Sequence, residues 1–125
     1  MVIEVKLRGY EAFIEYMKNL DAKGENVNVY FTGDKVDGVS WCPDCNDAEP
    51  HVRKALPLAA PNSYFIYVEV GDRPFWKDMK CPFRTDKNIH ISVLPSFIRW
   101  KCPQRLEGVE KISKDDLLEM FLTDD

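Results

Sequence analysis

Two cysteines, Cys42 and Cys45, lie between a predicted strand and a predicted helix. Residues 27–32 form an apolar, β-branched run that predicts a buried strand, and residues 46–58 have helical spacing, with the helix beginning near Cys42. A Cys-x-x-Cys pair at such a junction is typical of a redox dithiol. This junction constrains the fold strongly, because a buried strand has to lead into the start of a helix.

The other periodic segments place the junction within an alternating series of strands and helices. Strands are predicted at residues 2–7, 64–70, 96–100 and 105–109, and helices at residues 10–20, 83–87 and 114–122. Residues 33–40 are predicted to be a polar loop. The first three strands are joined by helices and are expected to run parallel, whereas the last two form a hairpin. The chain therefore predicts an α/β fold: a three-layer α/β/α sandwich with a mixed five-stranded sheet.

Length and charge limit the class of protein. The chain has 125 residues and a net charge of −4, so we predict a single domain over residues 1–125. A mildly acidic chain lacks the basic stripe of nucleic-acid-binding proteins. No apolar run is long enough to span a bilayer, and the first residues lack the features of a signal peptide. We expect a cytoplasmic monomer that binds neither nucleic acid nor membrane.

The residues of the dithiol motif suggest how it reacts. Pro43 suits the first helical position, which makes Cys42 the cap residue. The sulfur of Cys42 then faces the free amides and the positive end of the helix, which favours the attacking thiolate. Cys45 lies one turn further on, heads the buried stripe of the helix and suits the resolving role. We expect Trp41 to shield both sulfurs from water, and Asp44 to oppose the thiolate without outweighing the helix end.

Two other interpretations of the cysteines were weighed. A Cys-x-x-Cys pair can be half of a zinc site, but Cys81 and Cys102 are far apart, and neither His51 nor His90 has ligand spacing to the pair. We therefore expect no metal. A purely structural dithiol is the remaining alternative. Cys81 and Cys102 are interpreted as free thiols without a role.

A proline at the start of the strand at residues 96–100 is the second candidate feature. Sequence order can bring Leu94 and Pro95 beside the dithiol, where a cis peptide bond would leave the preceding backbone free to pair with an extended substrate. A trans proline at a strand start is the commoner arrangement for a proline taken alone.

The sequence resembles the thioredoxin superfamily, and within it the small Clot-type proteins of about 14 kDa, the thioredoxin domain-containing protein 17 family. The matching segments cover most of the chain and include Tyr-Phe-Thr-Gly at residues 30–33, Ser-Trp-Cys-Pro-Asp-Cys at residues 40–45 and Gly-Asp-Arg-Pro-Phe-Trp-Lys-Asp at residues 71–78. Ordinary thioredoxin has Gly-Pro between its cysteines. The resemblance therefore implies a thioredoxin-like fold with a modified active motif.

The resemblance also implies roles for individual residues. Cys42 is the nucleophile and Cys45 the resolving thiol, while Pro43 and Asp44 tune the redox potential. Substrate contacts are implied for Trp41, Leu94 and Pro95, with Pro95 as the cis-proline of the superfamily. Leu94 and Ser96 depart from the residues that relatives often carry, which bears on substrate choice.

The family resemblance further implies an activity and partners. It implies a cytosolic disulfide reductase for small or selected protein disulfides, with no bound cofactor and with electrons from NADPH through thioredoxin reductase. A contribution to peroxide defence and a dynein light chain partner are implied as well. The alternative function is a redox-switched adaptor that does not turn over.

Two departures from ordinary thioredoxin predict a narrow substrate range. Tyr30 and Tyr67 take the positions nearest to the buried Asp and Lys of thioredoxin, so Cys45 has to lose its proton to another group or to water. The aspartates of residues 33–40, together with Asp44, predict an acidic rim that repels acidic partners. We therefore expect good reduction of cystine and poor reduction of insulin.

Overall fold

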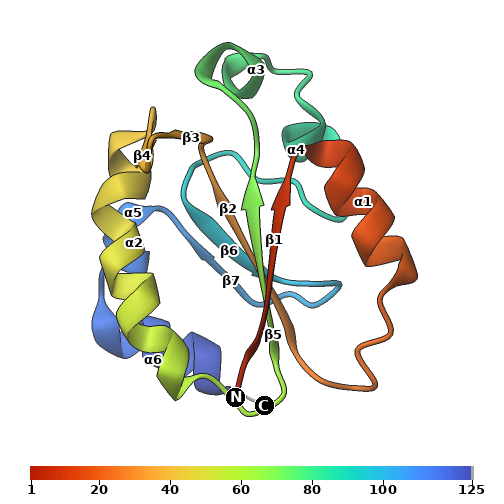
Figure 1. The fold of residues 1–125 in the computed structure, drawn as a ribbon, viewed down its shortest axis with the longest axis vertical. Coiled ribbons are helices and arrows are strands. Elements are labelled where there is room, and N and C mark those ends of the chain that lie inside the picture. Colours follow the sequence, from red (N-terminus) through yellow and green to blue (C-terminus); the bar gives the residue numbers. More distant parts are fainter. Residues whose placement is uncertain (125) are drawn as a thin grey trace.

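A mixed five-stranded sheet forms the centre of the computed structural model, which describes residues 1–124 (Figure 1). Across the sheet the strands are β1 (Ile3–Arg8), β5 (Tyr64–Glu69), β2 (Val27–Thr32), β6 (Ser96–Arg99) and β7 (Arg105–Glu107). The first three run parallel, with Ile66 of β5 in register with both Val5 and Val29, whereas β6 and β7 are antiparallel to their neighbours. The predicted mixed sheet is confirmed.

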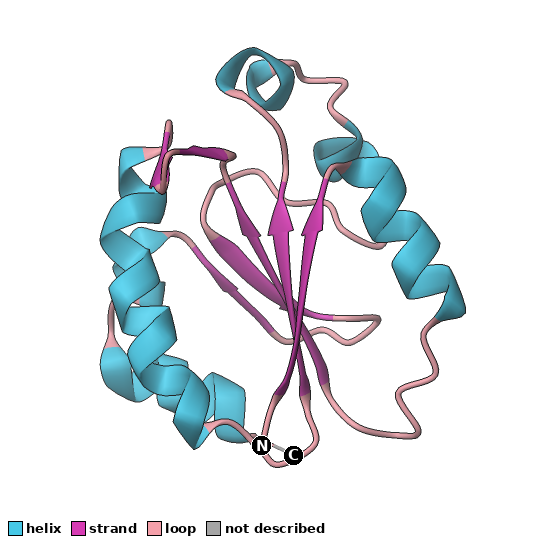
Figure 2. Ribbon diagram, in the orientation of Figure 1, coloured by secondary structure: helices cyan, strands magenta, loops and turns pink. Residues whose placement is uncertain are grey.

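Helices cover both faces of this sheet, as Figure 2 shows. One face carries α1 (Tyr10–Asn19) and α4 (Pro82–Thr85); the other carries α2 (Pro43–Ala55), the short 3-10 helix η1 (Leu56–Leu58), α5 (Val109–Ile112) and α6 (Asp115–Thr123). A further short helix, α3 (Arg73–Lys77), lies beyond the carboxyl end of β5. Within residues 1–124, no helix has the length and apolar character needed to cross a membrane.

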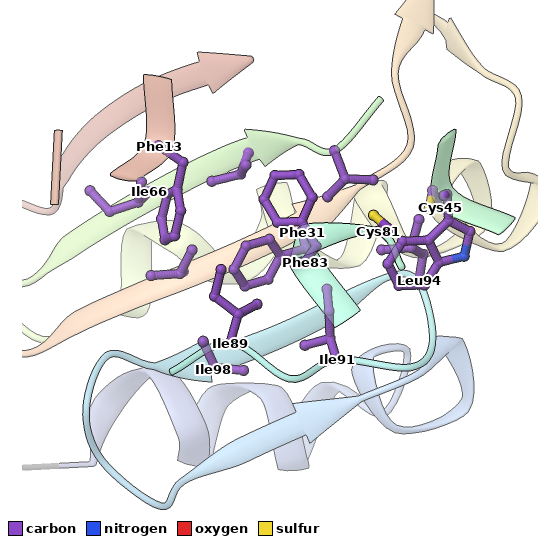
Figure 3. Packing of buried hydrophobic residues seen from close by; sticks show 14 of the residues in the cluster. Phe13, Phe31, Cys45, Ile66, Cys81, Phe83, Ile89, Ile91, Leu94 and Ile98 are labelled. Carbon is purple, nitrogen blue, oxygen red and sulfur yellow. The ribbon is translucent and has the colours of Figure 1, made fainter. Parts of the chain in front are cut away.

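Alternating side chains of the central strands separate the core into two layers. On the α1 side, Phe13 of α1 and Phe83 of α4 both pack against Phe31 of β2, with ring centroids 5.6 and 5.8 Å from it (Figure 3). On the α2 side, Tyr30 of β2 packs against Phe97 of β6. Burying each large apolar side chain contributes about 1.5–3 kcal/mol, so both layers stabilise the sheet against which α2, the helix that carries the dithiol, packs.

The prediction of a simple loop at residues 33–40 is wrong. These residues form a small hairpin of β3 (Lys35–Val36) and β4 (Val39–Ser40). Its turn is Asp37-Gly38, and both residues have positive φ, 55° and 82°. Asp-Gly is favoured in two-residue hairpin turns because both central positions require positive φ. Each strand has only two residues, too few for an alternating pattern to be visible in the sequence.

Two short helices were also missed. Helix α3 lies between the strand predicted at residues 64–70 and the helix predicted at residues 83–87, and α5 begins at Val109, which was assigned to the last strand. That strand ends earlier because Gly108 turns the chain with φ 94°. The long helix after the dithiol was predicted to continue to residue 58, but its last three residues, Leu56–Leu58, form the 3-10 turn η1.

Candidate active site

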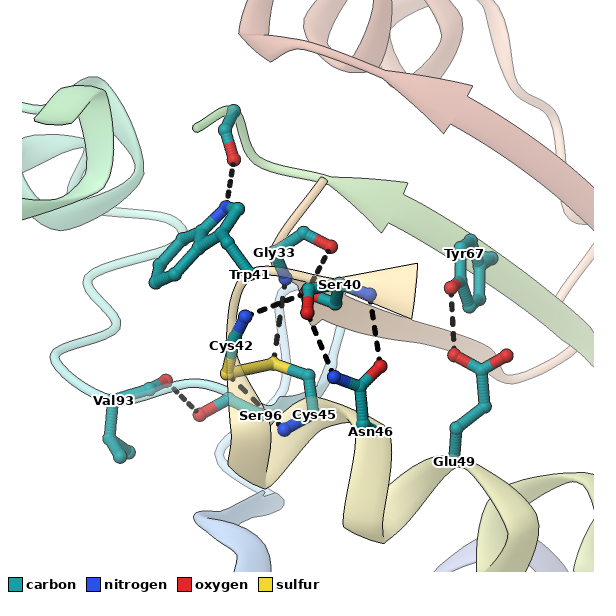
Figure 4. Close-up of a disulfide and its surroundings, with 11 residues drawn as sticks. Gly33, Ser40, Trp41, Cys42, Cys45, Asn46, Glu49, Tyr67, Val93 and Ser96 are labelled. Carbon is teal, nitrogen blue, oxygen red and sulfur yellow. Dashed lines mark hydrogen bonds between the residues drawn. A yellow bond between two sulfur atoms is a disulfide. The ribbon is translucent and has the colours of Figure 1, made fainter. Parts of the chain in front are cut away.

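Cys42 and Cys45 are joined by a disulfide at the start of α2, with Cα atoms 5.2 Å apart (Figure 4). Cys42 is the N-cap residue, and Pro43 follows at the first helical position, as predicted. The backbone amide of Cys45 donates a hydrogen bond to the sulfur of Cys42 at 3.2 Å. Cys42 is 6% exposed and Cys45 only 1%. Of the two cysteines, Cys42 at the helix start is therefore the more exposed, and Cys45, one turn further into α2, is the more deeply buried.

Three polar groups hold the β3–β4 hairpin against the dithiol (Figure 4). The side chain of Asn46 accepts from the Ser40 amide at 2.9 Å and donates to the Ser40 carbonyl at 2.8 Å. The Ser40 hydroxyl accepts from the Cys42 amide at 3.1 Å and donates to the carbonyl of Gly33. The amide of Gly33 points at the sulfur of Cys45 from 3.5 Å. Sequence analysis missed Ser40 and Asn46, although both lie directly beside the motif.

Trp41 fills the space between the hairpin and the segment after β5. Its indole nitrogen donates to the carbonyl of Gly71 at 2.8 Å, and its ring passes so close to Gly33 that a Cβ there would lie 2.8 Å from the ring. Glycine is required at position 33 by this close approach. The half-buried Trp41 also lines the cavity beside Cys42, and its shielding of the sulfurs from water stays a prediction.

The Leu94–Pro95 peptide bond is cis, so this prediction is confirmed. The buried Leu94 side chain and its neighbour Val93 line the cavity beside Cys42. The carbonyl of Pro95 accepts from the Gly108 amide at 2.9 Å, which ties this segment to the turn after β7. The sheet therefore brings Leu94 to the dithiol although the two are far apart in sequence, and Pro95 follows immediately at the start of β6.

A cavity of about 340 Å³ opens beside Cys42. Its lining includes Trp41, Cys42, Pro43, Asp44, Arg73, Trp76, Lys77, Arg84, Ser92, Val93 and Leu94. The lining holds three cationic side chains and one carboxylate. The predicted acidic rim is therefore wrong for this cavity: Asp34 of the hairpin instead accepts a hydrogen bond from the Gly71 amide at 2.8 Å.

Tyr30 and Tyr67 do not provide a proton acceptor for Cys45. Burial raises the pKa of the Tyr30 hydroxyl, which has no hydrogen-bond partner within residues 1–124. Burial and a 2.8 Å hydrogen bond to Glu49 raise the pKa of Tyr67 (Figure 4). Glu49 also pairs with Lys35 of the hairpin. Both tyrosines stay protonated at neutral pH, and the loss of the Cys45 proton to another group or to water stays a prediction.

A buried carboxylate supports the other end of the hairpin. Glu69, 2% exposed, accepts from the Lys35 amide at 3.0 Å and pairs with Arg8 at 2.8 Å. Burial alone would raise its pKa, but the Lys35 amide, Arg8 and Lys6 together lower it below the ordinary value. Glu69 is therefore charged at neutral pH and holds the hairpin to the sheet.

The two remaining cysteines are free thiols. Cys81 is buried in the core layer on the α1 side, where Figure 3 shows it, and Cys102 is exposed. Neither residue lines the cavity beside Cys42. The prediction that both are free thiols is confirmed, and the absence of a role for them stays a prediction.

Comparisons with known proteins agree with this geometry. The family described as thioredoxin domain-containing protein 17-like, thioredoxin domain, matches residues 6–124. Thioredoxin domain-containing protein 17 of Danio rerio is 43% identical over 123 residues, which cover 98% of this chain and 96% of that protein. The thioredoxin-like protein Clot of Arabidopsis thaliana is 31% identical over 93 residues, 72% of this chain and 69% of that protein. The fold is similar to that of Fasciola hepatica thioredoxin, with a TM-score of 0.56 at 16% identity, covering 94% of this chain and 98% of that one.

Proposed function

The chain belongs to the thioredoxin domain-containing protein 17-like family, with a thioredoxin-like fold and a redox-active Cys42–Cys45 pair, and from that premise we propose that it reduces small and selected protein disulfides. One observation carries the proposal. The sulfur of Cys42 accepts a hydrogen bond from the Cys45 amide at the start of α2, and Cys42 lines an open cavity. A sulfur placed there is favoured as thiolate and can be reached by a substrate.

The reaction proceeds by two exchanges. The Cys42 thiolate attacks one sulfur of the substrate disulfide; a Cys42–substrate disulfide forms, and the first substrate thiolate leaves with the electron pair and takes a proton from water. The Cys45 thiolate then attacks Cys42, the intramolecular disulfide forms, and the second substrate thiolate leaves. The substrate gains two electrons, and the protein is left in the oxidised form seen in Figure 4.

The resemblance supplies the remaining parts of the proposal. NADPH, through thioredoxin reductase, returns the pair to the dithiol, and the protein itself holds no cofactor. The protein acts in the cytoplasm as a monomeric single domain, contributes to peroxide defence and has a dynein light chain partner. Pro43 and Asp44 set the redox potential, and Trp41, Leu94 and Pro95 contact the substrate. What supports the substrate contacts is that Trp41 and Leu94 line the cavity and that Pro95 follows Leu94 through the cis bond.

Turnover separates this function from the adaptor alternative. The purified protein is mixed with thioredoxin reductase, NADPH and cystine, and NADPH oxidation is followed by absorbance. A reductase consumes many equivalents of NADPH per protein, and Cys42→Ser consumes none above the reductase alone. An adaptor consumes one equivalent and stops, which would overturn the proposed function. Cys102→Ser, which removes an exposed cysteine outside the cavity, is the matched control and keeps the wild-type rate.

A further inference from the structure

We propose that Arg73 and Lys77 of α3 make the site selective for disulfides that carry a carboxylate close to the sulfurs. This inference rests on the proposed disulfide reduction and specifies its substrate class. Both residues line the cavity beside Cys42, together with Arg84. Through Arg73 and Lys77, α3 recognises the substrate, which the dithiol motif alone does not do.

The local structure of α3 places the two cations together. Asp72 caps the helix by accepting from the Phe75 amide at 3.0 Å, and Trp76 is buried beneath it, 4% exposed. Arg73 and Lys77 are four positions apart, so they lie on the same helix face. With the helix capped and its buried tryptophan fixing its rotation, both cations line the cavity together.

Arg84 anchors this arrangement from α4. Its Nε donates to the carbonyl of Trp76 at 2.7 Å, and its guanidinium stacks 3.9 Å from the centre of the Trp76 ring. The stacking holds Trp76, and with it α3, in place. No other hydrogen bond joins this guanidinium to residues 1–124, so a charged group remains at the cavity wall.

Arg73 and Lys77 differ from several other cations near the site, which are paired with carboxylates. Arg8, Lys6 and Lys35 are each paired with a buried or half-buried carboxylate. Among the described residues, 1–124, no ion pair or side-chain hydrogen bond engages Arg73 or Lys77. Asp44 is the one carboxylate in the cavity lining, against three cations. A net positive cavity in a chain of net charge −4 attracts an anion to the place where Cys42 reacts.

The substrate chemistry follows from the neighbours of these cations. Trp41 and Leu94 provide apolar walls for the carbon chain on either side of a disulfide, and Arg73 and Lys77 provide the counter-charge for its carboxylate. In the first exchange, the Cys42 thiolate attacks the sulfur nearest to that carboxylate, and the other half of the substrate leaves as a thiolate. The exchange is balanced as in the proposed reaction and needs no further reactant.

Three small symmetric disulfides test the selectivity: dithiodipropionate, which is dianionic; hydroxyethyl disulfide, which is neutral; and cystamine, which is dicationic. The reduced protein is mixed with each in excess, and its oxidation is followed through tryptophan fluorescence, with released thiol measured in parallel. Each rate is divided by the rate with free dithiothreitol, which removes the intrinsic reactivity of the disulfide. The corrected ratio of anionic to neutral rates is the quantity compared between variants.

We expect Arg73→Gln/Lys77→Gln to lower this ratio about fivefold, since two exposed charges act at short range. Asp44→Asn raises the ratio. Lys80→Gln/Lys87→Gln removes the same charge outside the cavity lining and leaves the ratio unchanged. Because a change in the reactivity of Cys42 acts on both substrates, it cancels in the ratio. With the wild-type protein, the ratio also falls as salt is raised to about 0.5 M, because ions screen exposed charges; this measurement needs no variant.

A ratio that is the same in wild type and in Arg73→Gln/Lys77→Gln, or a corrected preference for cystamine, would overturn the selectivity while leaving disulfide reduction in place. A protein that releases no thiol from any of the three disulfides would overturn the proposed function itself, and the selectivity with it. The two failures are therefore distinguished within one set of measurements.

Discussion

The side-chain amide of Asn46 holds both backbone polar groups of Ser40, at 2.9 and 2.8 Å. Asn46 follows Cys45 in α2, and Ser40 ends the β3–β4 hairpin. The pair therefore joins the hairpin to the helix that carries the dithiol. Through its hydroxyl, Ser40 also accepts a hydrogen bond from the Cys42 amide, so the position of Cys42 depends on this pair.

Replacing Asn46 by Ala should disturb Cys42 without touching it. Two hydrogen bonds to the Ser40 backbone are lost, and we expect the free energy of unfolding to fall by about 1–3 kcal/mol. The alkylation rate of Cys42 in the reduced protein, resolved by peptide mapping, should fall as the sulfur loses its fixed place at the helix start. Asn19→Ala is the matched control, because within residues 1–124 the side-chain amide of Asn19 donates only to the carbonyl of Glu15 on α1. Wild-type alkylation in Asn46→Ala would show that Asn46 does not position the nucleophile.

The buried carboxylate of Glu69 predicts a pH dependence of stability. Its pKa is lower in the folded protein than in the unfolded chain, where it has its ordinary value. A group with a lowered folded pKa stabilises the protein above its unfolded pKa, and this contribution is lost as the pH falls through the folded pKa. Glu69→Gln should therefore lower the free energy of unfolding at pH 7 by about 2 kcal/mol.

Urea unfolding at neutral pH and near pH 4 measures this effect. The difference between wild type and Glu69→Gln should be large at neutral pH and smaller under acid. Glu4→Gln is the control, because Glu4 forms only a half-exposed pair with Arg53 and should change stability by less than about 0.5 kcal/mol. A pH-independent difference would mean that the ionised form of Glu69 does not contribute to folding.

Bulky protein disulfides should be reduced slowly. Cys42 is 6% exposed and lies beside a cavity bounded by Trp41 and Leu94, so the substrate disulfide has to enter that cavity. Asp44 adds a carboxylate next to the nucleophile. We expect insulin to be reduced more slowly than by a thioredoxin measured side by side, and Asp44→Gly to raise the insulin rate by about twofold to fivefold, the range for one solvent-exposed charge. Equal insulin rates for this protein and thioredoxin would remove the argument for a restricted site.

The dithiol junction could be predicted from the sequence because every signal for it is local. The buried run at residues 27–32, Pro43 at the first helical position and the stripe headed by Cys45 lie within one short segment. The cis bond before Pro95 was predicted from the resemblance, because the residues alone favoured trans. Gly71 accepts a hydrogen bond from Trp41, and Gly33 leaves room for the Trp41 ring. Residue spacing could not identify these two roles, because only the fold brings both glycines to the ring.

The charge of the site could not be read from residue order. The aspartates nearest to the dithiol in sequence suggested an acidic rim, but Asp34 turns to the Gly71 amide. Arg73 and Lys77 lie in α3, which follows β5. Because β5 lies beside β2 in the sheet, α3 is brought close to the start of α2. Asn46 presents a different case. It lies next to the motif, but nothing in the hydrophobic periodicity predicts that its side chain hydrogen-bonds to the backbone of Ser40.

The most direct test of the account is to trap the reaction after its first exchange. Cys45→Ser leaves Cys42 free to attack but removes the resolving thiol, so the reduced variant mixed with cystine should accumulate one half-cystine adduct per protein. Mass spectrometry of the digested protein should place that adduct on Cys42. An adduct on Cys81 or Cys102, with Cys42 unmodified, would contradict the assignment of Cys42 as the nucleophile.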